Sequence, residues 1–327
     1  MHSRYGGGVH DEKGAGWLAT FPKDSKVTAS DGTPLAYTVK GGGDGVPVVF
    51  INGWTCPDSY WVKIGPGVMA SGRPVLYLDV RGHGESGLPR PPGFCARNLR
   101  AEDVSAVRVA RDIVEVIEAA GFERAVLAGH SMGVQAMIEV ARIAPHRVAG
   151  LIPIAGTFEN PVKSFADLAI LDRLYPIADV LFRFVPFEFL RPVIKRTANP
   201  EIGVKVIRAI HVGGPKVTAE DMAGHMAHVG EVNFSVLFKM MSGLRAQQTA
   251  EFLPSITAPT LVLAGCEDLF TPPSVQQKMA DLIPDSEIVW FPEGGHLLPA
   301  EEPEGIIDAI VDFLHRRVPP PPARIPA

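Results

Sequence analysis

The chain has 327 residues, of which 46% are hydrophobic and 20% charged, so it can bury a large core and carry a main domain with an inserted segment. Its formal net charge of −5 is small, which argues against nucleic acid or an anionic membrane as the main partner. The three cysteines, Cys56, Cys95 and Cys266, are too few and too scattered for a disulfide framework or a thiolate metal site. We expect Cys266 to be a small buried side chain.

Both ends of the chain differ in composition from the rest. Residues 1–25 are predicted to be a disordered N-terminal segment, because they are rich in glycine and charge and lack the apolar run of a signal peptide. The proline-rich tail, residues 319–327, is predicted to be disordered as well. The most apolar stretch, Leu168 to Leu190, is interrupted by charges such as Asp172 and Arg183, so we expect no membrane insertion and a cytoplasmic protein.

Strand and helix signals alternate along most of the chain. Residues Lys26 to Lys40 alternate around Asp31-Gly32, which predicts an opening β-hairpin. Short apolar runs then predict strands that are buried on both faces: Val46–Ile51, Val75–Val80, Ala125–Ala128, Val148–Ile154, Thr260–Ala264 and Glu287–Phe291. Helical spacing predicts helices between and after them: Val104–Ala120, Gln135–Ile143, Ser274–Ile283 and Pro303–Arg316.

The alternation stops between Thr157 and Arg245. Apolar residues such as Phe165, Leu168 and Leu171 recur at helical spacing there, which predicts about four helices inserted after the sixth strand. The phenylalanines of this stretch more often belong to the core of an insertion than to a substrate site, and the pattern does not separate the two: Phe182, Phe184, Phe187 and Phe189.

The most informative segment is Val126 to Gly133, a buried-strand run that ends in Gly-x-Ser-x-Gly. A serine on a sharp turn between strand and helix needs neighbours without a Cβ, and Gly129 and Gly133 supply that room. The turn exposes the Ser131 hydroxyl and directs the next backbone N–H, that of Met132, to the same place. The motif is short, but a buried strand precedes it and an amphipathic helix follows, which is the context that it requires.

Four further segments occur in a fixed order along the chain. Two precede the serine motif, Val48–Trp54 and Val75–Ser86 with its Asp-x-Arg-Gly-x-Gly-x-Ser loop, and two come after it, Thr260–Asp268 and Glu293–His296. With the serine motif they resemble α/β-hydrolases of the capped esterase, epoxide-hydrolase and C–C-hydrolase type. The resemblance implies an α/β fold with a mostly parallel eight-stranded sheet covered by helices on both faces. It also implies a hydrolase core over residues 26–156 and 246–318 and a helical cap over residues 157–245.

The resemblance assigns a serine nucleophile, an acid and a histidine in that order along the chain. Ser131 is the expected nucleophile, and His296, which follows two glycines, is the expected base. Asp268 is the expected acid, with its neighbour Glu267 as one alternative. Some relatives place the acid after the sixth strand, which makes Glu159 the other alternative.

The oxyanion hole is expected from the backbone N–H groups of Met132 and Trp54, because charge that develops on an acyl oxygen needs preorganised donors. The chain departs from the family at Asn52, where histidine is usual, and this leaves the surrounding hydrogen bonds open. Trp54 is expected to narrow the mouth of the pocket. Three residues that flank these groups are expected to contact the substrate: Gly53, His130 and Leu297.

Other clusters of polar residues have weaker signals. Asp221, His225 and His228 lie at helical spacing, but no third histidine accompanies them, so we interpret them as a solvated helix face and expect no metal. In the family, loops such as the one that carries Asp79, Arg81 and His83 mainly brace the architecture. The glycines Gly41-Gly42-Gly43 lack the residues of a phosphate loop and predict a turn.

The primary hypothesis is a serine hydrolase that cleaves apolar carboxylic esters through an acyl-enzyme and needs no cofactor. Serine at position 131 argues against epoxide hydrolases and haloalkane dehalogenases, whose resemblance would require aspartate there. The same triad leaves four other reactions open: C–C-bond hydrolysis, lactone hydrolysis, cofactor-free haloperoxidation and acyl transfer. The sequence also leaves open whether the protein forms a homodimer. A ligand receptor that has kept the fold is the alternative from another class.

Overall fold

A computed structural model of the protein describes residues 21–89, 99–164, 173, 175, 199–209 and 212–319. One eight-stranded sheet has the strand order β1-β2-β4-β3-β5-β6-β7-β8. Strands β1 and β2 run antiparallel to their neighbours, and the remaining strands are parallel, as expected. The strands are β1 Ser25–Thr28, β2 Pro34–Lys40, β3 Val48–Ile51, β4 Val75–Leu78, β5 Ala125–His130, β6 Val148–Ile154, β7 Thr260–Gly265 and β8 Ser286–Phe291.

The central strands are apolar on both faces because helices cover both faces of the sheet. Along β3, Val49 and Ile51 pack into one cluster of buried side chains, and Val48 and Phe50 pack into a second cluster on the opposite face. Strand β5 alternates in the same way, with Leu127 in the first cluster and Val126 and Ala128 in the second. The sheet therefore separates two apolar cores.

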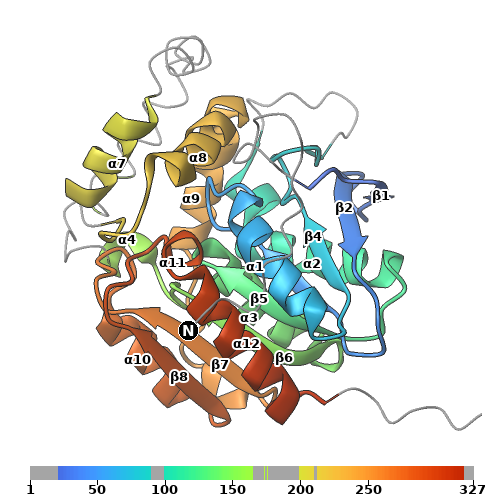
Figure 1. Ribbon diagram of the computed structural model, residues 1–327. Helices are drawn as coiled ribbons and strands as arrows, with labels where there is room; N and C mark the ends of the chain where they lie inside the picture. The colour runs from blue at the N-terminus through green and yellow to red at the C-terminus, as the bar shows by residue number, and fades with distance from the viewer. Residues whose placement is uncertain are drawn as a thin grey trace, which may run out of the picture.

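The first core lies under α2 (Ala106–Ala119), α3 (Met132–Ile143) and α10 (Pro273–Leu282). The second lies under α1 (Ser59–Ala70) and α12 (Pro303–Arg317), with the short helix α11 (Leu298–Glu301) beside them. Figure 1 shows α1 and α12 next to each other on one face of the sheet. The predicted layered α/β fold is confirmed, and α1 is an element that the sequence pattern did not predict.

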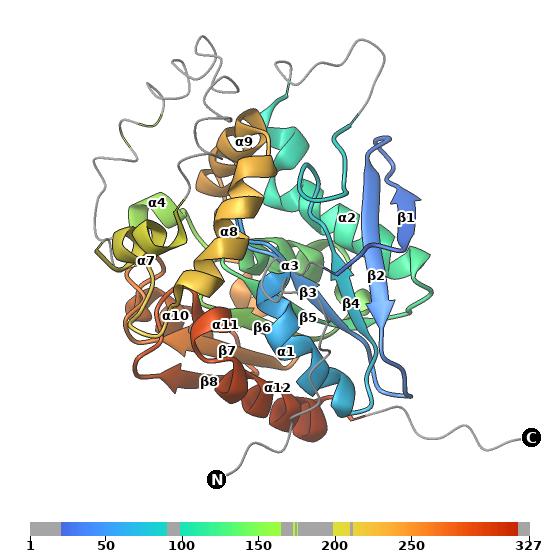
Figure 2. The same cartoon turned by 45° about the horizontal axis from the view of Figure 1, so that its top comes forward.

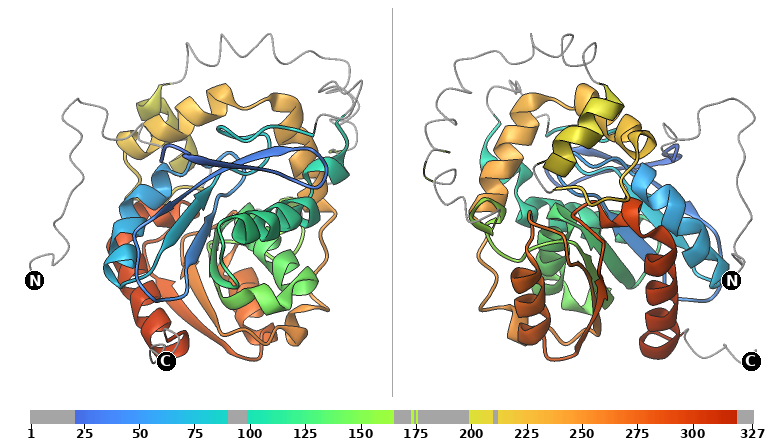
Figure 3. Two further views of the ribbon diagram at one scale, coloured as in Figure 1. Left: turned by 90° about the vertical axis from the view of Figure 1, so that its right-hand side faces the viewer. Right: turned by 60° about the vertical axis from the view of Figure 1, so that its left-hand side comes forward.

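The described part of the stretch between β6 and β7 consists of helices joined by loops. It contains α4 (Pro161–Ser164), α7 (Pro200–Ala209), α8 (Ala219–Glu231) and α9 (Phe234–Arg245). Figures 2 and 3 show α7, α8 and α9 together along one end of the sheet. Residues 165–172, 174, 176–198 and 210–211 lie outside the described ranges, as do the phenylalanines at 182–189, so the cap boundaries stay a prediction.

Side chains of α8 and α9 pack onto the main domain. Met222 of α8 shares a buried cluster with Cys56, Tyr60 and Leu297. On α9, Val236, Met240 and Leu244 join the first sheet core near Val104, the last residue of the short helix η2 (Ala101–Val104). The helical stretch is thus anchored at two places beside the C-terminal ends of the parallel strands.

The structure corrects the boundary of the N-terminal segment expected at residue 25. The Phe21 ring stacks on Tyr77 at a centroid distance of 3.8 Å. The Lys23 ammonium is buried between carboxylates, 2.5 Å from Asp58 and 3.1 Å from Asp79. Residues 21–25 therefore pack on the fold, whereas residues 1–20 and the tail from residue 320 lie outside the described ranges.

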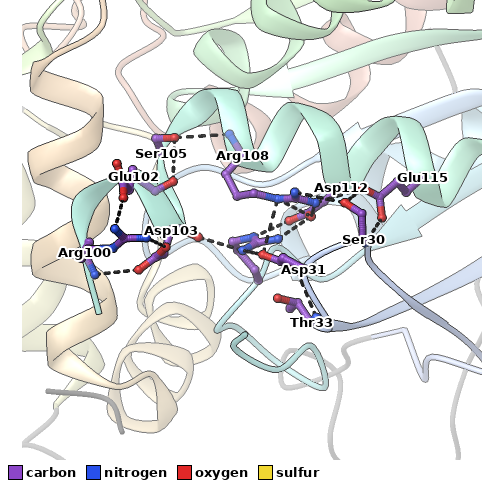
Figure 4. A network of polar contacts seen from close by, with 11 residues as sticks. Ser30, Asp31, Thr33, Arg100, Glu102, Asp103, Ser105, Arg108, Asp112 and Glu115 are labelled. Carbon is purple, nitrogen blue, oxygen red and sulfur yellow. Dashed lines mark hydrogen bonds and ion pairs between the residues drawn. The ribbon is translucent and has the colours of Figure 1, made fainter. Parts of the chain in front are cut away.

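The loop after β4 is held by buried ion pairs. Arg81 donates two hydrogen bonds to Asp112 of α2, at 2.5 and 2.6 Å, and a third to Asp31 at 2.8 Å. Arg108 reaches Asp112 at 2.8 Å and Glu115 at 3.0 Å, and Figure 4 shows this network between α2 and the β1–β2 turn. These contacts give the loop the bracing role predicted for it.

No helix in the described part of the chain is long and apolar enough to span a membrane.

Candidate active site

Ser131 lies at the junction of β5 and α3 with a strained backbone, at φ +53° and ψ −114°. Two close backbone approaches make this turn possible. A Cβ on Gly129 would lie 2.6 Å from the Gly133 backbone, and one on Gly133 would lie 2.5 Å from the Ile51 carbonyl oxygen. Because backbone cannot yield as a flexible side chain can, both positions require glycine, and the turn places the Ser131 hydroxyl at the edge of the sheet.

Three of the predicted side chains lie in hydrogen-bond contact. His296 Nε2 is 2.9 Å from Ser131 Oγ, and His296 Nδ1 is 3.1 Å from Asp268 Oδ2. Exposed fractions are 8% for Ser131, 5% for His296 and 0% for Asp268. With Nδ1–H donating to the carboxylate, Nε2 is left as the acceptor for the serine proton, which is the arrangement that activates a hydroxyl as a nucleophile.

Asp268 is fixed by donors from its own loop. Its Oδ1 accepts hydrogen bonds from the backbone N–H groups of Phe270 and Thr271, at 2.9 and 2.8 Å. Its Oδ2 accepts a hydrogen bond from the Thr271 hydroxyl at 2.5 Å and faces Gln276 Nε2 at 3.4 Å. Sequence reasoning missed Thr271, although aspartate favours turns in which its side chain bonds the backbone two residues on, as Asp268 does with Phe270.

The two alternative acids lie elsewhere. Glu267 is exposed beside Asp268, and its backbone N–H, not its carboxylate, is tied into the loop by a 2.9 Å hydrogen bond to Gly294. The Glu159 carboxylate lies 3.8 Å from Lys278, and its side chain is 38% exposed. Asp268 is the carboxylate in contact with the His296 ring.

The backbone N–H groups of Met132 and Trp54 donate to no acceptor within the described residues. Trp54 is held by its indole, which donates to the Leu237 carbonyl of α9 at 2.9 Å. The Asn52 side chain accepts a hydrogen bond from the Trp61 indole of α1, which answers the question raised by the absence of the usual histidine. Two donors are thus available next to Ser131.

A cavity of about 250 Å³ lies next to Ser131 and His296. Helices α8 and α9 contribute Met222, His225, Met241 and Leu244 to its wall, and none of the described lining residues is lysine or arginine. Apolar area dominates the described wall of the cavity. The other described lining residues are Trp54, Thr55, Cys56, Met132, Gln135, Thr157, Pro161, Ile207, Val212, Phe270, Thr271 and Leu297.

The three residues expected to contact substrate fall in different places. Leu297 lines the cavity, but Gly53 and His130 are not among the residues that line it. His130 is fully buried behind the site, with its Nε2 2.7 Å from the His296 carbonyl oxygen. A Cβ on Gly53 would lie 3.0 Å from the His130 ring, so this glycine permits close packing behind the elbow.

The expectation that Asp221, His225 and His228 form a solvated helix face was wrong. Asp221 is buried and pairs with Lys63 at 2.6 Å. His225 lines the cavity, and His228 stacks on His83 at a centroid distance of 5.6 Å. The error arose because helical spacing identifies a face but not which face meets the core. No group of metal-binding side chains occurs in the described ranges.

The cysteines also differ from expectation. Cys266 is exposed rather than buried, since the chain has already left β7 at this residue. Cys56 is the buried cysteine, and burial raises the pKa of its thiol to about 12. It lines the cavity as a neutral thiol, and Cys95 lies outside the described residues.

Comparison with known proteins agrees with this geometry. The model of the alpha/beta hydrolase family matches residues 48–309, most of the chain, and the protein belongs to this family. A relative from Variovorax paradoxus, named "Putative carbamate hydrolase RutD", is 28% identical over 289 residues, which is 86% of this chain and 97% of the relative.

Two solved structures share the fold. A thermophilic esterase from Thermogutta terrifontis has a TM-score of 0.68 at 24% identity, covering 90% of this chain and 98% of its own. The enol-lactonase from Burkholderia xenovorans has a TM-score of 0.62 at 18% identity, covering 89% of this chain and 100% of its own. At such identities the likeness concerns the fold, and the site must carry the argument on function.

Proposed function

We propose that this hydrolase cleaves carboxylic esters through an acyl-enzyme intermediate, with Ser131, His296 and Asp268 as a catalytic triad. The observation that carries the proposal is the continuous contact from Asp268 Oδ2 through the His296 ring to Ser131 Oγ, at 3.1 and 2.9 Å. A binding protein has no need for a strained serine aligned with a histidine–carboxylate pair.

In the first half-reaction, Ser131 Oγ attacks the ester carbonyl carbon while His296 Nε2 accepts the hydroxyl proton. The carbonyl oxygen gains negative charge, which the backbone N–H groups of Met132 and Trp54 stabilise. The C–O bond to the alcohol then breaks as His296 returns the proton to the departing oxygen. Water, deprotonated by the same imidazole, attacks the acyl-serine, and the acid is released with Ser131 restored.

The cavity supports a preference for apolar acyl groups. Side chains such as Met222, Met241 and Leu244 form the wall contributed by the helical stretch, which we propose acts as a cap. Each buried methylene adds roughly 0.8 kcal/mol of binding free energy. We therefore expect kcat/KM to rise from acetyl to medium-chain p-nitrophenyl esters and to fall once the chain exceeds the cavity. A steady fall from acetate upward would contradict an apolar acyl site.

A fluorophosphonate probe, which forms a covalent adduct with an activated serine, tests the triad directly. We expect stoichiometric labelling at Ser131 and, in Ser131→Ala, loss of labelling and a fall in ester turnover of about 10⁴-fold with the fold retained. Ser25→Ala is the control, because within the described ranges the Ser25 hydroxyl bonds only its exposed neighbour Asp24. Absence of both labelling and turnover in the wild-type protein would favour a receptor.

Carbamate hydrolysis is the second candidate, because likeness to the Variovorax relative extends over 86% of this chain. The carbonyl carbon of a carbamate bears a nitrogen atom in the place where that of an ester bears a carbon atom. The same nucleophile and oxyanion donors can act on both. A panel of p-nitrophenyl esters and matched N-alkyl carbamates distinguishes the two. We expect higher kcat/KM for the esters, and the reverse order would assign the protein to carbamates.

A further inference from the structure

Three polar side chains form a chain beside the cavity that the triad does not use. His225 of α8 faces two residues of the main domain: its Nδ1 is 3.1 Å from the Tyr60 hydroxyl and its Nε2 is 3.4 Å from Thr55 Oγ1. Thr55 and His225 line the cavity, and Tyr60 lies behind them, 3% exposed. Thr55 directly follows Trp54, which supplies one of the oxyanion donors.

The direction of these hydrogen bonds follows from the protonation states. Burial lowers the pKa of His225 to about 4, so its ring is neutral at neutral pH and carries one proton. Burial also raises the pKa of Tyr60 well above its ordinary value, so its hydroxyl stays protonated. The buried Tyr60 hydroxyl must donate, and within the described residues its acceptor is His225 Nδ1. The ring proton is therefore on Nε2, facing Thr55.

Two donors remain incompletely used at the cavity wall. The 3.4 Å separation between His225 Nε2 and Thr55 Oγ1 is long for a hydrogen bond, so the Nε2–H can also serve a ligand atom. If Thr55 Oγ1 accepts this proton, its own hydroxyl proton has no acceptor within the described part of the chain. Both protons can then point to one oxygen atom placed between the two side chains.

The backbone of Thr55 gives independent support. This β-branched residue has a φ of +63°, in the left-handed region that such side chains rarely adopt. Such conformations cost roughly 1–3 kcal/mol and gather at functional sites. The strained backbone holds the Thr55 hydroxyl at the cavity wall directly after the Trp54 N–H.

We propose that Thr55 and His225 form a donor pair that binds a second, uncharged oxygen atom of the substrate, apart from the carbonyl that Ser131 attacks. The inference rests on the proposed ester hydrolysis and specifies its substrate class: apolar esters that also carry a ketone or ether oxygen. The pair suits an uncharged oxygen better than a carboxylate, because no described residue of the cavity wall is lysine or arginine to balance a negative charge. Tyr60 is a positioning residue that fixes the tautomer of His225.

The kinetic test compares esters that differ by one oxygen. The acyl pair is p-nitrophenyl 4-oxopentanoate with 4-methylpentanoate, and the alcohol pair is 2-methoxyethyl hexanoate with butyl hexanoate. For each pair, the ratio of kcat/KM in a variant is divided by the wild-type ratio, so that differences in intrinsic reactivity cancel. We expect Thr55→Val, which removes the hydroxyl at equal size, to lower this ratio by about tenfold for one of the two pairs.

Two variants make the result specific. Thr55→Ser keeps the hydroxyl and should restore the ratio to within twofold of wild type. Tyr60→Phe should lower it by about three- to tenfold, because the tautomer of His225 is no longer fixed. Thr249→Val is the control, because Thr249 is not among the described cavity-lining residues and its hydroxyl donates to the Phe158 carbonyl at 2.7 Å, so its ratio should not change. An unchanged ratio in both Thr55→Val and Tyr60→Phe would overturn the proposal.

A binding experiment separates this proposal from ester hydrolysis itself. Calorimetry on Ser131→Ala measures the affinity for the intact esters with no turnover, alone and combined with Thr55→Val. Weaker binding of the oxygen-bearing ester, by about fivefold or more in the double variant, supports the donor pair even if the wild-type protein hydrolyses none of them. Equal affinities in the two proteins would reject the donor pair while leaving hydrolysis intact.

Discussion

The His130 ring bonds the main chain of His296 across the junction between the two loops that carry Ser131 and His296. His130 Nε2 lies 2.7 Å from the His296 carbonyl oxygen, and its ring is fully buried. Burial, assisted by the neighbouring His296, lowers the pKa of His130 to about 3, so the ring is neutral and Nε2–H is the donor. The residue before the serine therefore holds the loop that carries His296 in place next to the Ser131 turn.

Replacement of His130 by leucine should destabilise the protein. The change leaves the buried His296 carbonyl without its donor, which costs about 1–3 kcal/mol in the free energy of unfolding. Urea unfolding measures this loss, and His315→Leu serves as the control because His315 is exposed on α12. Equal stability of the two variants would show that the carbonyl finds another donor and that His130 does not hold the loop.

The identity of the acid can be tested with three isosteric substitutions. Asp268→Asn should lower kcat by roughly 10³–10⁴-fold, because the imidazole loses the carboxylate that orients it. Glu267→Gln and Glu159→Gln should each change kcat by less than about tenfold, since neither carboxylate contacts His296. Steady-state kinetics on one ester suffices, and a crippling effect of either glutamine variant would move the acid away from Asp268.

Sequence pattern predicted the sheet well and missed one helix for a physical reason. Strands β3 to β7 are mainly apolar runs, a signal that burial on both faces enforces. Strand β8, at the sheet edge, is only partly buried, so the expectation that it is buried on both faces was wrong. Helix α1 contains Gly65, Pro66 and Gly67, which have the lowest helix propensities, so its sequence does not look helical. The glycines serve packing: a Cβ on Gly65 would overlap the Tyr77 hydroxyl at 1.7 Å. Tertiary contact outweighs local preference here.

In the candidate site, too, residues carried by local motifs were predictable and residues placed by tertiary contacts were not. Ser131, Asp268 and His296 were predictable because each is carried by a local motif at the end of a strand, and their order along the chain is informative. His225 was not predictable as a cavity residue, because its place depends on how α8 packs against Tyr60 and Cys56. Long-range contact between the helical stretch and the main domain leaves no local pattern in the sequence.

The buried ion pair between Arg81 and Asp112 should dominate the stability of the region around the β4 loop. Their side chains are 0% and 2% exposed. Asp112→Asn leaves a buried guanidinium with weaker compensation, which should lower the free energy of unfolding by about 3–5 kcal/mol. Glu287→Gln, which breaks the exposed pair with Arg316, should cost under about 1 kcal/mol. Urea unfolding compares them, and similar losses would contradict a dominant buried pair.

Buried histidines set the expected pH dependence of stability. In the folded protein, burial lowers the pKa of four histidines from 6.5, to about 3 for His130 and about 4 for His83, His225 and His228. Between these values and 6.5 the unfolded chain binds protons that the folded protein does not, so these groups reduce stability as the pH falls. Well above pH 6.5, where the rings of the unfolded chain are neutral too, they contribute no pH dependence.

Two buried carboxyl groups act in the opposite sense. Burial raises the pKa of Asp79 and of Glu301, so their contribution to stability is present at acidic pH and is lost as the pH rises through the folded value. The four histidines outnumber the two carboxyl groups, so unfolding near pH 5 takes up protons on balance. The free energy of unfolding should therefore fall steadily from pH 7 to pH 5.

Urea unfolding at pH 7.5, 6.5, 5.75 and 5.0 measures this slope directly. In His228→Leu one titrating ring is absent, so unfolding between pH 6.5 and 5.0 should take up about one proton fewer. The free energy of unfolding should then fall less steeply with decreasing pH, whatever the change in stability at pH 7.5. His315→Leu, at an exposed position on α12, should keep the wild-type slope. A slope in His228→Leu equal to that of the wild-type protein would contradict a neutral, buried His228 ring.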